Sequence, residues 1–231
     1  MSERVKVETD DGAMPAHLWL PETGRGPGIL LVQEIFGVSA YIRRRAADLA
    51  ALGYVVLAPE IFWRLGVSEV ATGPDMLDEA LAVAGRADWD LAVADATAAL
   101  SALRERAEVD AGVGVVGFCF GGGLAYAVAA GSPVDALVSY YGSALPSLIE
   151  AVPAIEAPSL HHFGDADTYI PPETVEKIRV SVSTGGPVEL HVHPGAGHAF
   201  DNDDFVAHHA EASAAAWSIT ERWLASTLPA A

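Results

Sequence analysis

A lone cysteine lies in the most glycine-rich turn of the chain. Residues 117–123 read GFCFGGG and follow the apolar run VGVV, and Cys119 is the only cysteine among 231 residues. The stretch matches the nucleophile elbow, in which a strand, a sharp turn and a helix follow one another and a glycine lies two residues before and after the nucleophile. There the glycines let the backbones of strand and helix pass close together, and a helix N-terminus favours the thiolate form. The pattern predicts a reactive thiol and disfavours the alternative, a purely structural cysteine.

A carboxylate and a histidine follow in loops after later strands. The loop GDADTYIP carries Asp165 and Asp167, and one of them could orient a histidine; we expect Asp167, although turn chemistry alone could also explain both. His198 lies in the glycine-rich loop HPGAGHAF, before the last helix. Nucleophile, acid and then histidine is the order of the catalytic triad in α/β-hydrolases. We therefore predict that Cys119 attacks, His198 transfers protons and Asp167 orients His198.

A buried glutamate and two backbone amides complete the predicted chemistry. Glu34 ends the apolar run GILLVQE, where a carboxylate is costly unless it is hydrogen-bonded or functional. In α/β-hydrolases the loop after this strand supplies one oxyanion-hole N–H, and the residue after the nucleophile supplies the other. These positions predict the backbone N–H groups of Ile35 and Phe120 as the oxyanion hole.

The elements that must position these residues alternate between strands and helices. RVKVET and AHLWL alternate in polarity like an antiparallel pair joined by a turn, whereas GILLVQE and YVVLAPE are continuous apolar runs, typical of strands covered on both faces. Between these two runs, SAYIRRRAADLAALG has helical spacing, with Ser39 as its N-cap and Gly53 at its end. DWDLAVADATAALSALRER is a second amphipathic helix, and residues 203–228 are predicted to be the last one.

The whole pattern predicts one α/β domain over residues 1–231 with a mostly parallel sheet and an antiparallel N-terminal edge. Later strands are expected at VGVVGF, ALVSYYG, SLHHFGD and VELHVHP. Residues 60–86 mix tryptophan, glycine and proline with a helical fragment, and both a lid and an excursion over the sheet edge fit them.

Composition narrows the function classes. A net charge of −18 argues against nucleic acid and anionic membranes as partners, because nothing offsets phosphate repulsion. The sequence contains no long uncharged apolar run that would predict a membrane span, and its charged N-terminal residues do not resemble a secretory signal. A single cysteine is typical of a protein in the reducing cytoplasm. The chain lacks H-E-x-x-H and paired cysteines, so we expect no metal and no other cofactor.

The remaining histidines have structural explanations. His191 and His193 alternate with Val192 and are expected on a solvated face of a strand. His208 and His209 fall within the predicted last helix.

Five motifs in the same order resemble those of the dienelactone hydrolases (carboxymethylenebutenolidases). They are QEIFGVSAYIR, GFCFGGGLAY, YYG, GDADTYIP and AGHAF, and the resemblance extends from about residue 4 to residue 226. It implies an α/β-hydrolase fold with eight strands and helices on both faces, and a triad of Cys119, His198 and Asp167. It also implies that Glu34 contacts the resting cysteine and takes part in forming the thiolate.

The chain departs from this family at the substrate site. Asp201 and Leu77 stand where the family has arginines that bind the substrate carboxylate, Leu81 replaces a tyrosine and Ala199 replaces a serine. Because an acid near a carboxylate is repulsive, a neutral ester or lactone is expected to be a better substrate than dienelactone. Arg64 or Arg86 could restore carboxylate binding, and the candidates for substrate contacts are Arg64, Trp63, Tyr141 and Ala199.

We therefore predict a cytoplasmic hydrolase, a monomer or small homo-oligomer, that cleaves a small ester or lactone through an acyl-enzyme on Cys119. One alternative is a true carboxymethylenebutenolidase acting on dienelactone in chloroaromatic degradation. A second alternative is a binding protein that keeps the pocket without turnover, against which the complete triad argues. A third is a redox-sensing thiol, although no resolving cysteine is present.

Overall fold

The computed structural model describes residues 2–151 and 155–230. The chain forms two compact units: residues 2–114 with Ala230, and residues 115–229. Strand β5 (Val109–Phe118) begins in the first unit and ends in the second. The predicted organisation as one domain stays a prediction.

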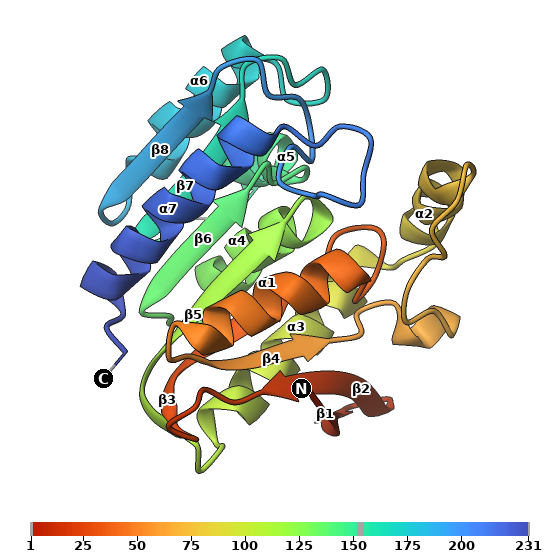
Figure 1. The fold of residues 1–231 in the computed structure, drawn as a ribbon, viewed down its shortest axis with the longest axis vertical. Helices are drawn as coiled ribbons and strands as arrows, with labels where there is room; N and C mark the ends of the chain where they lie inside the picture. The colour runs from red at the N-terminus through yellow and green to blue at the C-terminus, as the bar shows by residue number, and fades with distance from the viewer. Residues whose placement is uncertain (1, 152–154, 231) are drawn as a thin grey trace. The chain divides into compact units, whose positions relative to one another are not determined.

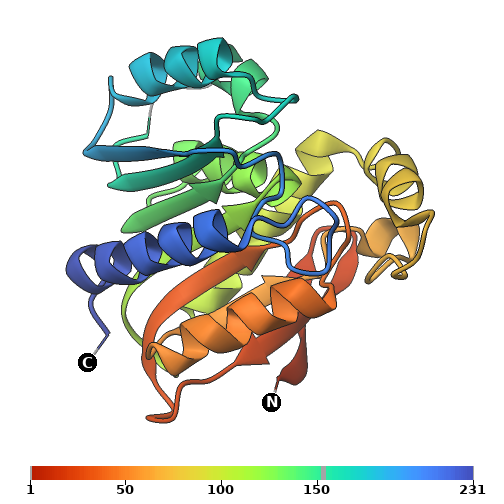
Figure 2. The same ribbon diagram turned by 45° about the horizontal axis from the view of Figure 1, so that its top comes forward.

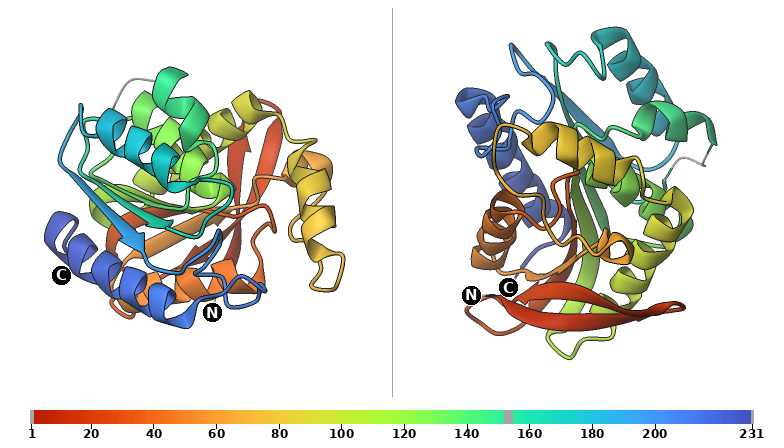
Figure 3. Two further views of the ribbon diagram at one scale, coloured as in Figure 1. Left: turned by 90° about the horizontal axis from the view of Figure 1, so that it is seen from above. Right: turned by 90° about the vertical axis from the view of Figure 1, so that its right-hand side faces the viewer.

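The first unit is built from a hairpin, two parallel strands and helices on both of their faces. Its strands are β1 (Glu3–Thr9), β2 (Gly12–Trp19), β3 (Gly26–Val32), β4 (Val55–Pro59) and the start of β5, and its helices are α1 (Ala40–Ala51), a 3₁₀ turn (Trp63–Leu65), α2 (Met76–Ala84) and α3 (Trp89–Arg104). β1 pairs antiparallel with β2 and β2 with β4, whereas β3 and β4 are parallel. α1 packs on β4 and α3 packs on β3, from opposite faces of these strands (Figures 1 and 3).

Local sequence explains why these elements form. All seven residues of β3 are buried, as expected for a continuous apolar run. The Ser39 hydroxyl oxygen accepts a hydrogen bond from the backbone N–H of Ile42, and Gly53, with φ +104°, follows the end of α1. The predicted N-cap and end of this helix are therefore confirmed. Residues 60–86 contain the 3₁₀ turn and α2, and their role as a lid stays a prediction.

The second unit continues the alternation of strands and helices. It contains the end of β5, then α4 (Phe120–Gly131), β6 (Ala136–Tyr140), α5 (Leu145–Ala151), β7 (Ser159–Gly164), α6 (Pro172–Val182), β8 (Val188–His193) and α7 (Ala210–Thr227). β6 pairs parallel with β7, and β7 with β8. α7 covers one face of these strands, and α4 packs on β6 from the other (Figure 2).

The last helix begins later than predicted. α7 starts at Ala210 instead of near residue 203, because the His209 ring nitrogen accepts a hydrogen bond from the backbone N–H of Ala212 and caps the helix. The backbone N–H of His209 in turn donates to the carbonyl of Phe200 at 2.9 Å. The expectation that His208 and His209 lie within the helix is therefore wrong.

The strand order in the described part of the chain is β1-β2-β4-β3-β5-β6-β7-β8, a single eight-stranded sheet. The antiparallel pairings that the structure assigns involve only β1, β2 and β4, at the N-terminal edge. The predicted α/β class, the mostly parallel sheet, the antiparallel edge and the strand number are all confirmed.

Candidate active site

Cys119 lies at a strained turn between β5 and α4. Its φ and ψ are +51° and −115°, and its backbone N–H donates to the carbonyl of Tyr140 at 3.0 Å. A Cβ on Gly117 would lie 2.0 Å from the carbonyl oxygen of Gly121, so only glycine permits this approach of strand and helix. The predicted elbow, with glycines that allow a sharp turn, is the geometry that the structure has.

Three side chains from three segments of the second unit form one hydrogen-bonded chain. His198 Nε2 lies 3.1 Å from the sulfur of Cys119, and His198 Nδ1 lies 2.7 Å from Oδ2 of Asp167. The other oxygen of Asp167 accepts from the backbone N–H groups of Tyr169 and Ile170, at 2.7 and 3.0 Å. Both carboxylate oxygens are therefore used, and the carboxylate is fixed against the imidazole.

Asp165 has a different task. It is exposed, and its Oδ1 accepts a hydrogen bond from the backbone N–H of Gly195 at 2.7 Å. This contact holds the start of the loop that carries His198. Of the two carboxylates in the loop, Asp167 is thus the one beside the histidine.

The environment of His198 favours its charged form. Burial alone lowers the pKa of the imidazole, but hydrogen bonds to Asp167 and Cys119, together with the charges of both groups, outweigh burial and raise the pKa to about 10. A protonated histidine next to sulfur stabilises a thiolate. The site can therefore hold a charged imidazole beside the sulfur of Cys119.

Backbone strain is concentrated around these side chains. In residues 2–151 and 155–230, the non-glycine residues with positive φ are Cys119, Tyr141 and Ala199, at +51°, +37° and +58°. Tyr141 follows β6, and Ala199 follows the histidine directly. Conformations of this kind cost about 1–3 kcal/mol each and persist where the surrounding structure enforces them, most often at functional sites.

Aromatic rings flank the imidazole of His198. Tyr141 meets it edge-on with ring centroids 5.3 Å apart, and Tyr169 lies at 5.2 Å. Tyr141 is fully buried and Ala199 is 4% exposed, and their role as substrate contacts stays a prediction. Tyr169 is 66% exposed. The sequence reasoning missed Tyr169, although its place two residues after Asp167 was a usable signal.

Asp201 is a buried structural residue. It is 1% exposed and accepts a hydrogen bond from the Ser213 hydroxyl of α7 at 2.8 Å. Its carboxylate thus anchors the end of the histidine loop to α7. The expected repulsion between Asp201 and a substrate carboxylate stays a prediction.

His193 is buried, so the prediction of a solvated strand face is wrong for this residue. Its Nε2 lies 3.0 Å from Nδ1 of His162, and the other His162 nitrogen lies 3.1 Å from the Thr220 hydroxyl of α7. Phe200 packs against the His193 ring with centroids 5.1 Å apart. The alternation of side chains along β8 could not reveal that α7 and the loop with Phe200 cover the end of this strand.

The other predicted site residues divide between the two units. Glu34 and Ile35 lie in the first unit; Glu34 is fully buried, and Ile35 is partly exposed. Phe120, in the second unit, is the first residue of α4 and is partly exposed. Their roles in activation and oxyanion binding stay predictions.

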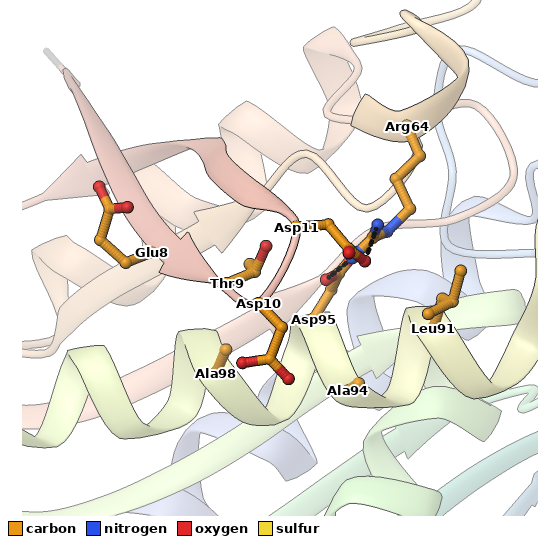
Figure 4. A pocket seen from close by; sticks show the side chains of 9 residues that line it. All are labelled: Glu8, Thr9, Asp10, Asp11, Arg64, Leu91, Ala94, Asp95 and Ala98. Atoms are coloured by element: carbon orange, nitrogen blue, oxygen red, sulfur yellow. Dashed lines mark hydrogen bonds and ion pairs between the residues drawn. The ribbon is translucent and has the colours of Figure 1, made fainter.

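The arginine expected to bind substrate is engaged within its own unit. Arg64 donates to both oxygens of Asp95 at 2.8 and 3.0 Å (Figure 4). Trp63 Nε1 donates to the same carboxylate at 2.8 Å. A substrate contact through Arg64 or Trp63 would have to compete with this buried carboxylate. Leu77 is a partly exposed residue of α2.

Two negative findings apply to residues 2–151 and 155–230. No group of three or more histidine, cysteine, aspartate or glutamate side chains is arranged to hold a metal ion. No helix there combines the length and apolar character needed to cross a membrane.

Comparison with known proteins identifies the family. The model of the dienelactone hydrolase family matches residues 14–228. A carboxymethylenebutenolidase of Pseudomonas sp. (strain P51) is 34% identical over 203 residues, 87% of this chain and 85% of the relative, and one of Pseudomonas putida is 30% identical over 94% and 93%. The crystal structure of a putative dienelactone hydrolase from Klebsiella pneumoniae superposes with a TM-score of 0.83 at 28% identity, covering 97% and 98% of the two chains. The chain therefore belongs to the dienelactone hydrolase family and is a hydrolase.

Proposed function

We propose that this protein hydrolyses a small ester or lactone through an acyl-enzyme on Cys119. The observation that carries the proposal is the continuous chain from Asp167 through His198 to the sulfur of Cys119, with contacts of 2.7 and 3.1 Å at a strained turn. A nucleophile, a base and a group that orients the base are the parts that acyl transfer requires.

The reaction proceeds in two steps. The Cys119 thiolate attacks the carbonyl carbon, and the carbonyl oxygen takes up negative charge as the C–S bond forms. We propose that the backbone N–H groups of Ile35 and Phe120 stabilise this oxyanion, a contribution of about 3 kcal/mol per donor in other hydrolases. Protonated His198 gives its proton to the departing alkoxide, and the C–O bond breaks.

Deacylation uses the same groups with reversed proton flow. His198, now neutral, takes a proton from water as the water attacks the thioester carbonyl, and the C–S bond breaks to release the acid. The charge of Asp167 stabilises the imidazolium that forms again. Glu34 is proposed to accept the thiol proton when the free enzyme binds substrate and to return it to the sulfur after deacylation, because a thiolate beside a carboxylate is unfavourable.

A second candidate is a carboxymethylenebutenolidase that acts on dienelactone. The relatives from Pseudomonas carry that name, and Asp201, the acid expected to repel an anionic substrate, is buried and hydrogen-bonded to Ser213 of α7. The engagement of Arg64 by Asp95 weighs against Arg64 as a replacement for the family arginines, whereas Arg86 is exposed and stays a candidate. The ratio of kcat/KM for dienelactone to that for a neutral aryl ester separates the two candidates.

Trapping the acyl group tests the proposal. The protein is mixed with p-nitrophenyl acetate, quenched in acid within one turnover and digested, and the peptides are weighed by mass spectrometry. An acetyl group on the peptide that contains Cys119, absent from the variant Cys119→Ala, is the expected result. Acetylation of another residue in step with p-nitrophenol release would overturn the mechanism.

A further inference from the structure

A short segment of the 60–86 region pairs with the loop that follows β3. The backbone N–H of Val38 donates to the carbonyl of Ser68, and the N–H of Val70 donates to the carbonyl of Phe36, both at 2.9 Å. Gly37 and Glu69 form the bridge between these bonds. The side chain of Glu69 also forms an ion pair with Arg43 of α1. Residues 68–70 therefore act as a short strand against residues 36–38.

Gly37 permits this close pairing. Its φ is +80°, and a Cβ at this position would lie 2.3 Å from the carbonyl oxygen of Ser68. Any other residue would push the two segments apart. The contact between residues 36–38 and residues 68–70 therefore depends on the backbone of Gly37 as well as on the side chain of Glu69.

The buried side-chain amide of Gln33 joins Ile61, near the start of the 60–86 region, to the peptide group between Glu34 and Ile35. Gln33 is fully buried; its Oε1 accepts from the backbone N–H of Ile61 at 3.2 Å, and its Nε2 donates to the carbonyl of Glu34 at 3.5 Å. The same carbonyl accepts from the N–H of Gly37 at 3.2 Å. Because a peptide unit is planar and trans, holding the carbonyl of Glu34 also fixes the direction of the N–H of Ile35.

The middle of the segment is fastened to the rest of the first unit. Arg64 makes a two-pronged contact with Asp95 of α3, which is 1% exposed, and its third nitrogen reaches Asp11, in the turn between β1 and β2, at 2.6 Å (Figure 4). The guanidinium also lies over the ring of Trp63, 4.7 Å from its centroid. Such two-pronged pairs are geometrically specific. Residues 61–70 are therefore held at their start, middle and end.

We propose that residues 61–70 are a brace that sets the orientation of the Ile35 N–H, and that Gln33 and Arg64 are positioning residues for the oxyanion hole. The proposal rests on the proposed function, in which that N–H stabilises the oxyanion. It replaces a role of Arg64 as a ligand for the substrate carboxylate with a role inside the fold. The brace acts on the transition state, so its loss lowers kcat and leaves KM nearly unchanged.

Three methionine variants test the brace. Gln33→Met removes both amide hydrogen bonds, Arg64→Met removes the contacts with Asp95 and Asp11, and Arg25→Met is the matched control, since Arg25 pairs with Asp110 elsewhere in the same unit. With p-nitrophenyl acetate we expect kcat to fall about tenfold for Gln33→Met and Arg64→Met, a fraction of the roughly hundredfold that a 1 Å displacement can cost. KM should stay within about twofold, and Arg25→Met should match the wild type.

A second readout separates the brace from general damage. Alkylation of Cys119 by iodoacetamide does not use an oxyanion hole, so its rate should stay at the wild-type value in both brace variants. Equal losses of alkylation and hydrolysis would overturn the brace. An unchanged kcat in folded Gln33→Met would also overturn the brace. The same holds if Arg64→Met raises KM only for an ester that carries a free carboxylate. Failure of the proposed function is distinct, because Cys119→Ala would then hydrolyse the ester like the wild type.

A surface variant keeps the test decisive if a buried substitution prevents folding. Glu69→Ala removes an exposed ion pair at the end of the brace. We expect a fall in kcat of about twofold to threefold without a change in KM, in proportion to the weakness of surface pairs. A kcat equal to that of the wild type in Glu69→Ala, with the other variants unfolded, would contradict the brace.

Discussion

The second unit contains two histidine sites of opposite electrostatic character. His198 lies beside Asp167 and Cys119, and its pKa is raised to about 10. His162 lies between His193 and Thr220; burial, followed by the nearby histidines, holds its pKa well below the ordinary value of 6.5. Both rings are largely buried, so burial does not decide the difference. An ionised partner within hydrogen-bond distance does.

The difference assigns a task to each site. His198 can carry a charge beside the sulfur of Cys119, as the proposed reaction requires. His162 stays neutral and uses both nitrogens to join β7, β8 and α7. His162 and His193, here called the neutral pair, thus support the end of β8, from which the loop of His198 begins.

Among the variants that compare the two sites, removal of the charged histidine, His198, is expected to have the largest effect on activity. His198→Ala should lower kcat/KM by about 10⁴-fold, because the thiolate loses its stabilising cation and deacylation loses its base. Steady-state kinetics on p-nitrophenyl acetate measures the loss. His191→Ala, which removes a partly exposed histidine of β8, serves as control. A loss below about tenfold would show that His198 is not the base.

The two carboxylates of the β7 loop give the next largest contrast. Asp167→Asn should lower kcat/KM by about 10³-fold, since the amide no longer stabilises the imidazolium. Asp165→Asn keeps an oxygen for the N–H of Gly195, and its effect should be below about threefold. Equal losses in the two variants would assign the effect to loop structure instead of to the triad.

The neutral pair should affect stability far more than turnover. His162→Gln disturbs buried hydrogen bonds to His193 and Thr220 and should lower the free energy of unfolding by about 2 kcal/mol. The kcat of the folded variant should stay within about threefold. Urea unfolding and kinetics on the same preparation measure both quantities. A large loss of kcat at unchanged stability would place His162 in the chemistry.

The two sites should also differ in how their contributions to stability depend on pH. The raised pKa of His198 stabilises the fold below pH 6.5, and this contribution is lost as the pH rises through about 10. The lowered pKa of His162 stabilises the fold above pH 6.5, and this contribution is lost as the pH falls. His198→Ala should thus flatten the alkaline side of the stability profile and His162→Gln the acid side, and identical profiles would refute the assignment.

Local patterns in the sequence predicted much of the fold and of the second-unit site. The run of apolar residues in β3, the cap at Ser39 and the glycines around Cys119 each depend on neighbours within a few residues. The order of Cys119, Asp167 and His198, which α/β-hydrolases share, predicted that these side chains would meet, and the structure places them in hydrogen-bond contact. These features needed no knowledge of distant contacts.

Contacts between distant residues could not be predicted in this way. Arg64 reaches Asp95 across 31 positions of the chain, so a buried ion pair looked like a free cation. Asp201 accepts a hydrogen bond from Ser213, so the sequence did not reveal that this residue anchors a loop to α7. His193 lies at the one covered end of a strand whose alternation is otherwise that of an exposed face.

The central claim is that Cys119 is the nucleophile, and hydrolysis by Cys119→Ala tests it most directly. The variant is compared with the wild type on a panel of aryl esters and lactones at neutral pH, after thermal unfolding has shown that both are folded. We predict that turnover of every substrate falls to the uncatalysed background. Turnover by Cys119→Ala at a rate near that of the wild type would contradict the account.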